Sequence, residues 1–172
     1  MGHVGVQVAA VLGAKVFSTV SSSGEEVIRG YGATPIDYTT TTVTQYMDAC
    51  TDGEGFDVIY DTVGGSTLDD SFAAARTYGR HVVSCLGWGI HKLAPWSFRA
   101  ATYSGVFTLL PLLTGQGRAH HDDILREATV LIEAGKLVPL METITFDFVH
   151  AFEAHELVGQ RRANGRVVVS IG

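Results

Sequence analysis

The chain has 172 residues, enough for one domain of ordinary size and too many for a mini-protein that depends on disulfides. Twelve basic residues against 18 acidic ones give a formal net charge of -6, so we expect no nucleic-acid partner, because binding to a phosphate backbone needs an excess of Lys and Arg. A hydrophobic content of 46% with 17% charged residues is typical of a folded chain and excludes a disordered one.

The front of the chain alternates short helices with short apolar strands. Apolar residues at helical spacing predict a helix that Gly13 ends, and a β-branched and aromatic run then predicts a strand. The expected elements in chain order are a helix over 4–12, a strand over 15–20, a polar loop over 21–24, a helix over 25–31, a strand over 36–38, a helix over 43–50, a strand over 56–63, a helix over 68–75 with Gly79 as its end, and a strand over 81–86. Strands that alternate with helices of about ten residues predict right-handed crossovers and a parallel sheet covered on both faces, which is a doubly wound α/β fold.

The second half is less regular. The apolar run 106–113 predicts a strand or the start of a buried helix, and Pro111 favours an edge or terminal position. Asp122 or Asp123 is expected to cap an amphipathic helix that Gly135 ends. After that helix we expect a short strand around residues 144–146, a helix after Asp147 and a last strand over 166–171.

Candidate ligand positions follow from the sheet alone, because ligands of an open parallel sheet bind beyond the carboxyl ends of its strands. The positions at those ends are Val20–Ser22, Tyr38, Thr62–Gly64 and Cys85–Gly87. Small residues at all of them but Tyr38 let an extended dinucleotide lie close to the backbone. Each glycine taken alone is explained equally well as a turn residue, but their coincidence at successive strand ends favours a binding site. The first helix begins at Gly2, and its N-terminus is suited to a pyrophosphate.

Cysteine usage and apolar runs carry few further expectations. Cys50 and Cys85 lie far apart in the sequence and form no CxxC pair, so we expect neither a disulfide framework nor a zinc ribbon, and a cytoplasmic location. No apolar run reaches the roughly 18 residues of a membrane span, so we expect no membrane partner.

Several blocks together resemble the cofactor half of medium-chain dehydrogenases/reductases, in the zinc-binding-dehydrogenase or quinone-oxidoreductase-like branch. The blocks are GHVGVQ near the start, GATPIDYTT, TDGEGFDVIYDTVGGSTLDDS and the closing GRVVVSI. The similarity runs along essentially the whole chain. It implies a Rossmann-like domain that transfers hydride between NADP(H) or NAD(H) and a carbonyl, an alcohol or an activated double bond.

The same resemblance implies a role for each matched position. Gly2, His3 and Val4 would approach the pyrophosphate, Ser21 and Ser22 would face the adenosine ribose, and Tyr38 matches a tyrosine near the 2′-phosphate. The path from adenine to nicotinamide would be lined by Thr62, Val63, Cys85, Leu86 and Gly87, with Phe107 as a nicotinamide neighbour.

The resemblance favours NADP(H) over NAD(H). An acidic residue after the second strand would bind the ribose 2′-hydroxyl and repel a 2′-phosphate, and Ser21 stands there instead. The basic residue that quinone reductases often place nearby is absent, since Glu25 and Glu26 occupy that stretch, and Arg29 is the alternative cation.

The chain also departs from the family pattern at its front. The first strand of the 3-2-1-4-5-6 order is missing, and since that strand is central, its loss would open the sheet between strands 2 and 4. Met1 stands inside the glycine turn, so we expect an internal methionine or a fragment. We expect a partial dinucleotide-binding domain over 1–138, and a tail over 139–172 that belongs against a missing N-terminal GroES-like catalytic domain.

No catalytic residue or metal ligand emerges from the sequence. His120 and His121 are adjacent on a helix and point apart, and the spacing of His150 and His155 differs from the i and i+4 spacing of zinc-binding helices. A short-chain dehydrogenase is excluded because no lysine follows a tyrosine at the required spacing of four residues.

The expected function is the cofactor-binding part of an NADP(H)-dependent oxidoreductase acting on a carbonyl, alcohol or quinone-like compound. We expect this part to be inactive alone, to meet its small-molecule substrate through the missing domain, and to form a homodimer through the apolar run 106–113. The alternative is a non-catalytic remnant that binds nucleotide or dimerises.

Overall fold

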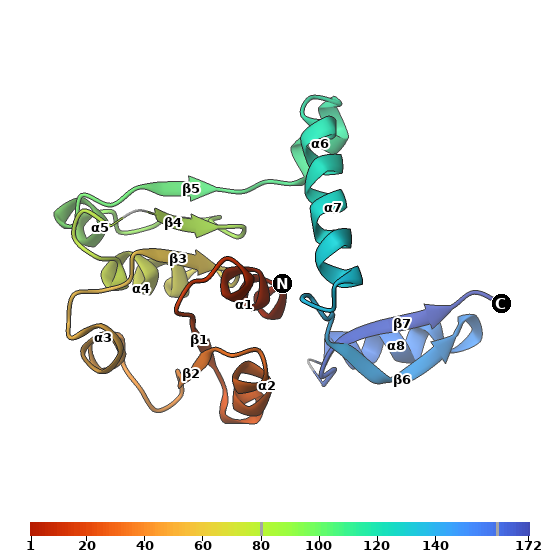
Figure 1. Cartoon of the computed structure of the whole chain (residues 1–172). Helices are drawn as coiled ribbons and strands as arrows, with labels where there is room; N and C mark the ends of the chain where they lie inside the picture. Colours follow the sequence, from red (N-terminus) through yellow and green to blue (C-terminus); the bar gives the residue numbers. More distant parts are fainter. Residues whose placement is uncertain (80, 161) are drawn as a thin grey trace. The chain divides into compact units, whose positions relative to one another are not determined.

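The computed structural model describes residues 1–79, 81–160 and 162–172 (Figure 1). The chain divides into two compact units, residues 1–127 and 128–172. The division into functional domains after residue 138 stays a prediction.

The first unit alternates helices and strands as the sequence predicts. Its elements are α1 (Gly2–Val11), β1 (Phe17–Val20), η1 (Ser22–Gly24), α2 (Glu25–Gly30), β2 (Thr34–Asp37), α3 (Val43–Thr51), β3 (Val58–Asp61), α4 (Ser66–Ala74), β4 (His81–Ser84), α5 (Ala94–Phe98), β5 (Tyr103–Gly105) and α6 (Leu109–Thr114), after which α7 (Arg118–Glu133) leads into the second unit. Local signals set some of the boundaries. At the start of α3, for example, Thr42 and Gln45 form a reciprocal capping box that satisfies two orphan backbone donors.

The strands of this unit form two parallel sheets. β1 pairs with β2, with Phe17 opposite Thr34, and β3, β4 and β5 form the second sheet in that order. Among the described residues no ladder joins β1 to β3. The α/β fold with parallel strands is therefore confirmed, and the sheet is interrupted at the position expected for its missing first strand.

Helix α1 spans this interruption (Figure 1). Gly5 of α1 lies so close to β3 that an added Cβ would be 2.9 Å from the Tyr60 ring. On the other side, Val6 packs in a small core with Ile28 and Ala33, and Val20 of β1 packs against the same core. The helix thus covers both open strand edges on one face.

The sheet of β3, β4 and β5 has its own core. The buried side chains are Leu68 and Phe72 of α4, Ala75 and Val82. The Phe72 ring makes an edge-to-face contact with the Tyr103 ring of β5, with centroids 5.7 Å apart. This packing fixes α4 against the sheet and so fixes the loop that leads from β3 into α4.

The second unit is a parallel β-α-β arrangement. It contains β6 (Met141–Asp147), η2 (Phe148–His150), α8 (Ala151–Gly159) and β7 (Arg166–Ser170), and β6 pairs with β7. Ala154 of α8 is buried. The two strands and the helix that the sequence predicts here are confirmed.

Three local expectations are wrong. Helix α7 begins at Arg118, so Asp122 and Asp123 do not cap it but pair with Arg126 one turn further along the helix. Helix α4 ends at Ala74 rather than Gly79, because Ala75 takes an extended backbone and forms a β-bridge with Phe56.

The third is the apolar run 106–113, which forms neither a strand nor a buried helix. Residues 109–114 form helix α6, whose four leucines are exposed. Pro111 lies in its first turn, where the missing N–H costs no helical hydrogen bond. No helix in the described ranges is long and apolar enough to cross a membrane.

Candidate functional site

The predicted ligand positions gather at the carboxyl ends of β1 to β4, in three groups. The first follows β1 and β2. The backbone N–H of Tyr38 donates to the carbonyl of Val20 at 3.3 Å, which holds the end of β2 beside Ser21 and Ser22. The Tyr38 side chain is exposed, and the Ser21 Oγ lies 3.1 Å from the Ser23 Oγ. Hydroxyl groups and a phenol ring therefore surround this end of the sheet.

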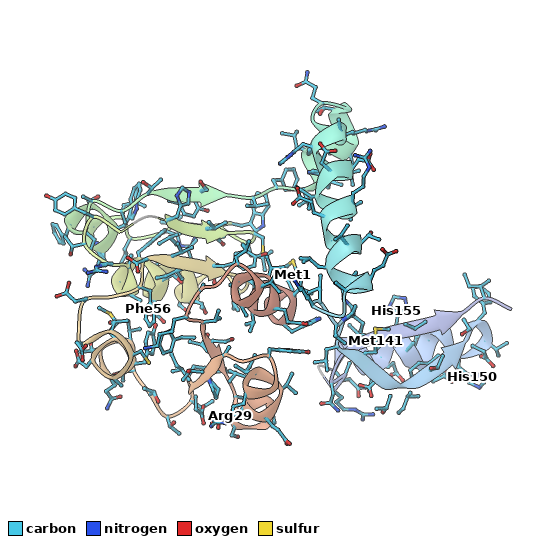
Figure 2. All side chains as sticks on the ribbon, in the orientation of Figure 1. Met1, Arg29, Phe56, Met141, His150 and His155 are labelled. Atoms are coloured by element: carbon cyan, nitrogen blue, oxygen red, sulfur yellow. The ribbon has the colours of Figure 1, made fainter. Side chains whose placement is uncertain are left out.

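The second group is the N-terminus of α1. An added Cβ on Gly2 would lie 3.8 Å from the Thr62 Oγ1, so the first turn of the helix lies beside the end of β3. Met1 stands at this end of the helix (Figure 2). The N-cap residue is Met1, and its side chain makes no capping hydrogen bond. His3 and Val4 belong to this turn, which presents the positive end of the helix dipole at the ends of the strands.

The third group consists of the loops that follow β3 and β4. Thr62 and Val63 follow β3, and Cys85, Leu86 and Gly87 follow β4. Val63 is 66% exposed and thus available to a ligand. Cys85 is half-buried, and its Sγ lies 3.9 Å from the Tyr60 hydroxyl oxygen. Burial raises the pKa of the Tyr60 phenol, and the adjacent Cys85 raises it further, so the phenol is neutral near pH 7.

A buried carboxylate connects these two loops. Asp61, the last residue of β3, is 3% exposed, and its oxygens accept hydrogen bonds from the backbone N–H of Val63 at 3.2 Å and of Gly64 at 3.0 Å. The Ser84 hydroxyl also donates to Asp61, at 2.7 Å, and accepts from the backbone N–H of Leu86 at 3.2 Å. One side-chain pair therefore fixes the backbone of both loops.

Glycine is needed at these strand ends for two reasons: the turns, and the close approach of the glycine backbone to neighbouring residues. Gly64 has a φ of +75°, and a Cβ there would overlap the carbonyl oxygen of Leu86. A Cβ on Gly87 would overlap the hydroxyl of Tyr103. Glycine is the residue that lets the two loops meet, so these positions are needed for loop packing as well as for the turns.

The sequence reasoning missed Asp61 and Ser84. A signal for Asp61 was present, because an aspartate that ends an apolar strand shortly before two glycines is typical of a side chain that bonds its own following turn. Ser84 carried no such signal, since a serine at the end of an apolar strand is equally compatible with an exposed position.

Arg29, the alternative cation for a 2′-phosphate, lies on α2 (Figure 2). Its guanidinium is 2.6 Å from the Glu25 carboxylate, one helical turn away. A phosphate would therefore compete with this carboxylate for Arg29.

The resemblance to zinc-binding dehydrogenases raises the question of whether these residues could bind zinc. In the ranges that the structure describes, no three His, Cys, Asp or Glu side chains converge as a metal site would require. The His150 imidazole instead pairs with Asp147 at 2.6 Å. The residues that the structure describes therefore do not fit a zinc site.

The chain matches known proteins along nearly its whole length. Residues 31–169 match the family model described as zinc-binding dehydrogenase. A 2-haloacrylate reductase from Burkholderia sp. is 30% identical over 177 residues, which cover 98% of this chain and 52% of that protein.

Solved structures agree with this assignment. The structure of an alcohol dehydrogenase superfamily protein from Novosphingobium aromaticivorans is 46% identical, with a TM-score of 0.95, and the match covers 99% of this chain and 52% of that one. A quinone oxidoreductase from Pseudomonas syringae pv. Tomato DC3000 is 25% identical with a TM-score of 0.78, over 99% of this chain and 53% of that one. The chain thus spans about half the length of these relatives. It belongs to the zinc-binding dehydrogenase family of the medium-chain dehydrogenase/reductase superfamily and corresponds to the cofactor-binding portion of those proteins.

Proposed function

We propose that this chain binds NADP(H) across the carboxyl ends of β1 to β4 and serves as the cofactor-binding part of an oxidoreductase. The observation that carries this proposal is the juxtaposition of the first turn of α1 with the loop after β3, which itself meets the loop after β4 at Gly64 and Leu86. A helix N-terminus beside close-packed glycine loops is the arrangement that receives a pyrophosphate in dinucleotide-binding folds.

Each group at this edge has a role in the proposal. The backbone of Gly2, His3 and Val4 faces the pyrophosphate, and Thr62 and Val63 lie next to it. Cys85, Leu86 and Gly87 line the route toward the nicotinamide, whose ring supplies or accepts the hydride when the cofactor is bound. What this chain contributes is a rigid loop pair, held by Asp61 and Ser84, that fixes the position of the dinucleotide.

Preference for NADP(H) rests on the residues that follow β1. The hydroxyls of Ser21 and Ser22 leave room for a 2′-phosphate and bring no carboxylate that would repel it. Tyr38 adds an exposed phenol at the same end. Arg29 reaches a phosphate when it leaves Glu25, which costs little because an exposed pair of this kind contributes only about 0–1 kcal/mol.

The proposed reaction is hydride transfer to or from a small carbonyl, alcohol or quinone-like substrate. Similar proteins bear names of this kind, a 2-haloacrylate reductase and a quinone oxidoreductase among them. We place most of the substrate site outside these 172 residues and expect no turnover from this chain alone. The unit of residues 128–172 exposes apolar side chains, which favours the proposal that a further domain covers them. These side chains are Ile144, Phe148, Val149 and Phe152.

A homodimer is the second part of the proposal. The leucines of α6 are exposed, and α6 follows β5, an edge strand of its sheet. This apolar surface also favours the alternative, a non-catalytic chain that only dimerises. The two cysteines are free thiols, which supports a reducing compartment such as the cytoplasm.

Titration of the purified chain with NADPH and with NADH, followed by calorimetry, tests the proposal. We expect saturable binding of both, tighter for NADPH, and no oxidation of NADPH in the presence of a quinone. Absence of binding by either cofactor would leave the non-catalytic alternative. Turnover by the chain alone would contradict the proposal that most of the substrate site lies outside these residues.

A further inference from the structure

The sequence contains a single asparagine, Asn164, and Gly165 follows it. Asparagine is chemically labile, and it is most labile before glycine, because glycine has no Cβ to keep its backbone nitrogen away from the side-chain carbonyl carbon of the asparagine. The pair lies just before β7, and Asn164 is exposed. Water therefore reaches the amide group that would react.

The backbone nitrogen of Gly165 is available as a nucleophile. In the ranges that the structure describes its N–H donates to no acceptor, whereas the N–H of the next residue, Arg166, donates to the carbonyl of Leu140 at 2.7 Å. The N–H of Asn164 donates to the Glu142 carboxylate at 2.7 Å, which holds the main chain without engaging the amide side chain. Attack by the Gly165 nitrogen therefore requires none of the described hydrogen bonds to open first.

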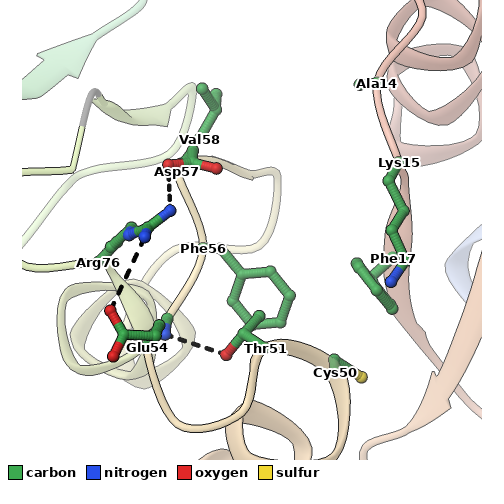
Figure 3. Close-up of a pocket in the computed structure, with 11 residues that line it drawn as sticks. Ala14, Lys15, Phe17, Cys50, Thr51, Glu54, Phe56, Asp57, Val58 and Arg76 are labelled. Carbon is green, nitrogen blue, oxygen red and sulfur yellow. Dashed lines mark hydrogen bonds and ion pairs between the residues drawn. The ribbon is translucent and has the colours of Figure 1, made fainter.

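A second pair of this kind provides a comparison within the same chain. Asp52 is also exposed and followed by a glycine, so its side chain could cyclise in the same way. The N–H of Gly53, however, donates to the carbonyl of Met47 at 3.2 Å, where α3 ends. The loop that follows is held by a hydrogen bond from the Gly55 N–H to the Thr51 hydroxyl at 3.0 Å (Figure 3). The fold therefore engages the nucleophile of this pair and not that of the first.

The main chain at Gly165 packs directly against the start of β6. A Cβ on Gly165 would lie 2.5 Å from the carbonyl carbon of Met141 and 2.8 Å from the backbone nitrogen of Glu142, so there is no room for displacement in that direction. Isoaspartate at residue 164 would add one methylene to the main chain. The extra length moves the glycine out of this contact and separates Arg166 from Met141, the first pair of the β6–β7 ladder.

We propose that Asn164 is a modification site at which the chain, with water, converts its own asparagine to isoaspartate and aspartate, and that the isoaspartate form loosens the pairing of β6 with β7. The Gly165 nitrogen forms a bond to the side-chain carbonyl carbon of Asn164, and its proton and the –NH2 group leave together as ammonia. Water then opens the five-membered imide at either carbonyl, which gives isoaspartate or aspartate. The conversion needs no oxidant or reductant, and the proposal does not depend on cofactor binding.

Ageing of the full chain at mildly alkaline pH, followed by cleavage after glutamate and mass spectrometry, tests the conversion. We expect the peptide of residues 157–172 to gain the mass difference between –NH2 and –OH. The rates in the folded and the guanidinium-unfolded chain should lie within about ten-fold of each other, because no local opening has to come first. Asn164→Gln is the control, since its longer side chain cannot form the five-membered ring. Retention of the amide by the folded chain alone, or a mass gain that persists in Asn164→Gln, would overturn the proposal.

Asp52 is the internal reference for the same aged samples. A carboxyl methyltransferase specific for isoaspartate, supplied with a labelled methyl donor, reports isoaspartate in each peptide. We expect label at residue 164 in both the folded and the unfolded chain, and label at residue 52 only in the unfolded chain, where the hydrogen bond of Gly53 is lost. Equal labelling of residue 52 in both states would show that this hydrogen bond does not protect, and would contradict the physical reason given for the difference.

Amide hydrogen exchange measures the effect on the ladder. We expect the Arg166 N–H, which is bound to Leu140, to exchange several-fold faster in the aged chain than in the fresh one, and the Thr34 N–H of the β1–β2 ladder to be unchanged. Asn164→Asp carries the charge of the product without the longer main chain and should exchange like the fresh chain. Unchanged exchange on ageing, or an equal increase in Asn164→Asp, would contradict the loosening of β6 and β7 by isoaspartate.

Discussion

The Ser84 hydroxyl donates a hydrogen bond to the Asp61 carboxylate at 2.7 Å, and both side chains are buried at the ends of neighbouring strands. Asp61 also accepts from the backbone of the loop after β3, while Ser84 accepts from Leu86 in the loop after β4. A buried pair whose hydrogen bonds are all internal holds its loops without relying on solvent. The pair therefore couples the stability of the fold to the shape of the proposed cofactor edge.

Replacement of Ser84 by alanine should lower the stability of the fold and weaken the binding of NADPH. It leaves the Leu86 N–H without its partner and removes one of the two hydrogen bonds to the Asp61 Oδ2, which keeps the one from the Gly64 N–H. Loss of a buried partner of this kind costs about 1–3 kcal/mol. We expect a lower free energy of unfolding in urea and several-fold weaker binding of NADPH. Ser71→Ala is the matched control, because Ser71 is also buried but bonds only within α4, to the carbonyl of Thr67. Equal loss of NADPH binding in both variants would show that Ser84 has no special effect on the loops.

Gly64 provides a second test of loop packing, with Gly32 as its control. Their φ angles are +75° and +76°, so alanine meets the same backbone strain at both, about 1–2 kcal/mol. A Cβ on Gly64 also overlaps the Leu86 carbonyl, whereas a Cβ on Gly32 meets nothing within 4 Å. We expect Gly64→Ala to be clearly less stable than Gly32→Ala in thermal unfolding and to bind NADPH more weakly. Equal stability of the two variants would contradict the close approach of the loops.

Cofactor preference should respond to the release of Arg29. In Glu25→Gln the guanidinium loses its carboxylate partner and is available to a 2′-phosphate. We expect NADPH binding to strengthen a few-fold relative to NADH, and the gain to fade at high salt because the interaction is exposed. Glu26→Gln removes an equal charge one residue away and should give a smaller change. If the gain persists when Arg29→Ala is added to Glu25→Gln, Arg29 is not the phosphate ligand.

Much of the fold was predictable from the sequence because local signals and packing agree there. The apolar run over 56–63 and the two glycines after it marked β3 and its turn, and the structure places a strand and a tight loop at that position. The break in the sheet was predictable as well, since it depends on strand order and not on side-chain detail. Expectations failed where a distant partner decides the outcome. The bridge between Phe56 and Ala75, for example, ends α4 before its glycine.

The strand ends that make up the candidate site could be located from the sequence, but the contacts that hold their loops together could not. Strand ends can be located from periodicity, which found Thr62, Leu86 and the other loop residues. The Asp61–Ser84 hydrogen bond joins residues 23 positions apart, and no local pattern specifies which side chains of two strands will meet. Long-range pairing of this kind has to be seen in three dimensions.

The Asp147–His150 pair predicts how the unit of residues 128–172 responds to pH. The hydrogen bond to Asp147 raises the pKa of His150, and the bond from His150 lowers the pKa of Asp147. A raised histidine pKa stabilises the fold below the unfolded pKa of histidine, and that contribution is lost as the pH rises through the folded value. A lowered aspartate pKa stabilises it above the unfolded pKa of aspartate and is lost on acidification. The pair therefore stabilises the fold most between the unfolded pKa of aspartate and the unfolded pKa of histidine, in mildly acidic solution.

Asp147→Asn tests this relationship. Asparagine can still accept from the His150 backbone N–H, as Asp147 does at 3.0 Å, so the cap of η2 is retained while the charge is removed. We expect the pKa of His150, followed by NMR of its ring carbons and protons, to fall toward its ordinary value. Asp122→Asn removes an equally exposed carboxylate that pairs with Arg126 and should leave His150 unchanged. An unchanged His150 pKa in Asp147→Asn would show that the Asp147 carboxylate does not control its protonation.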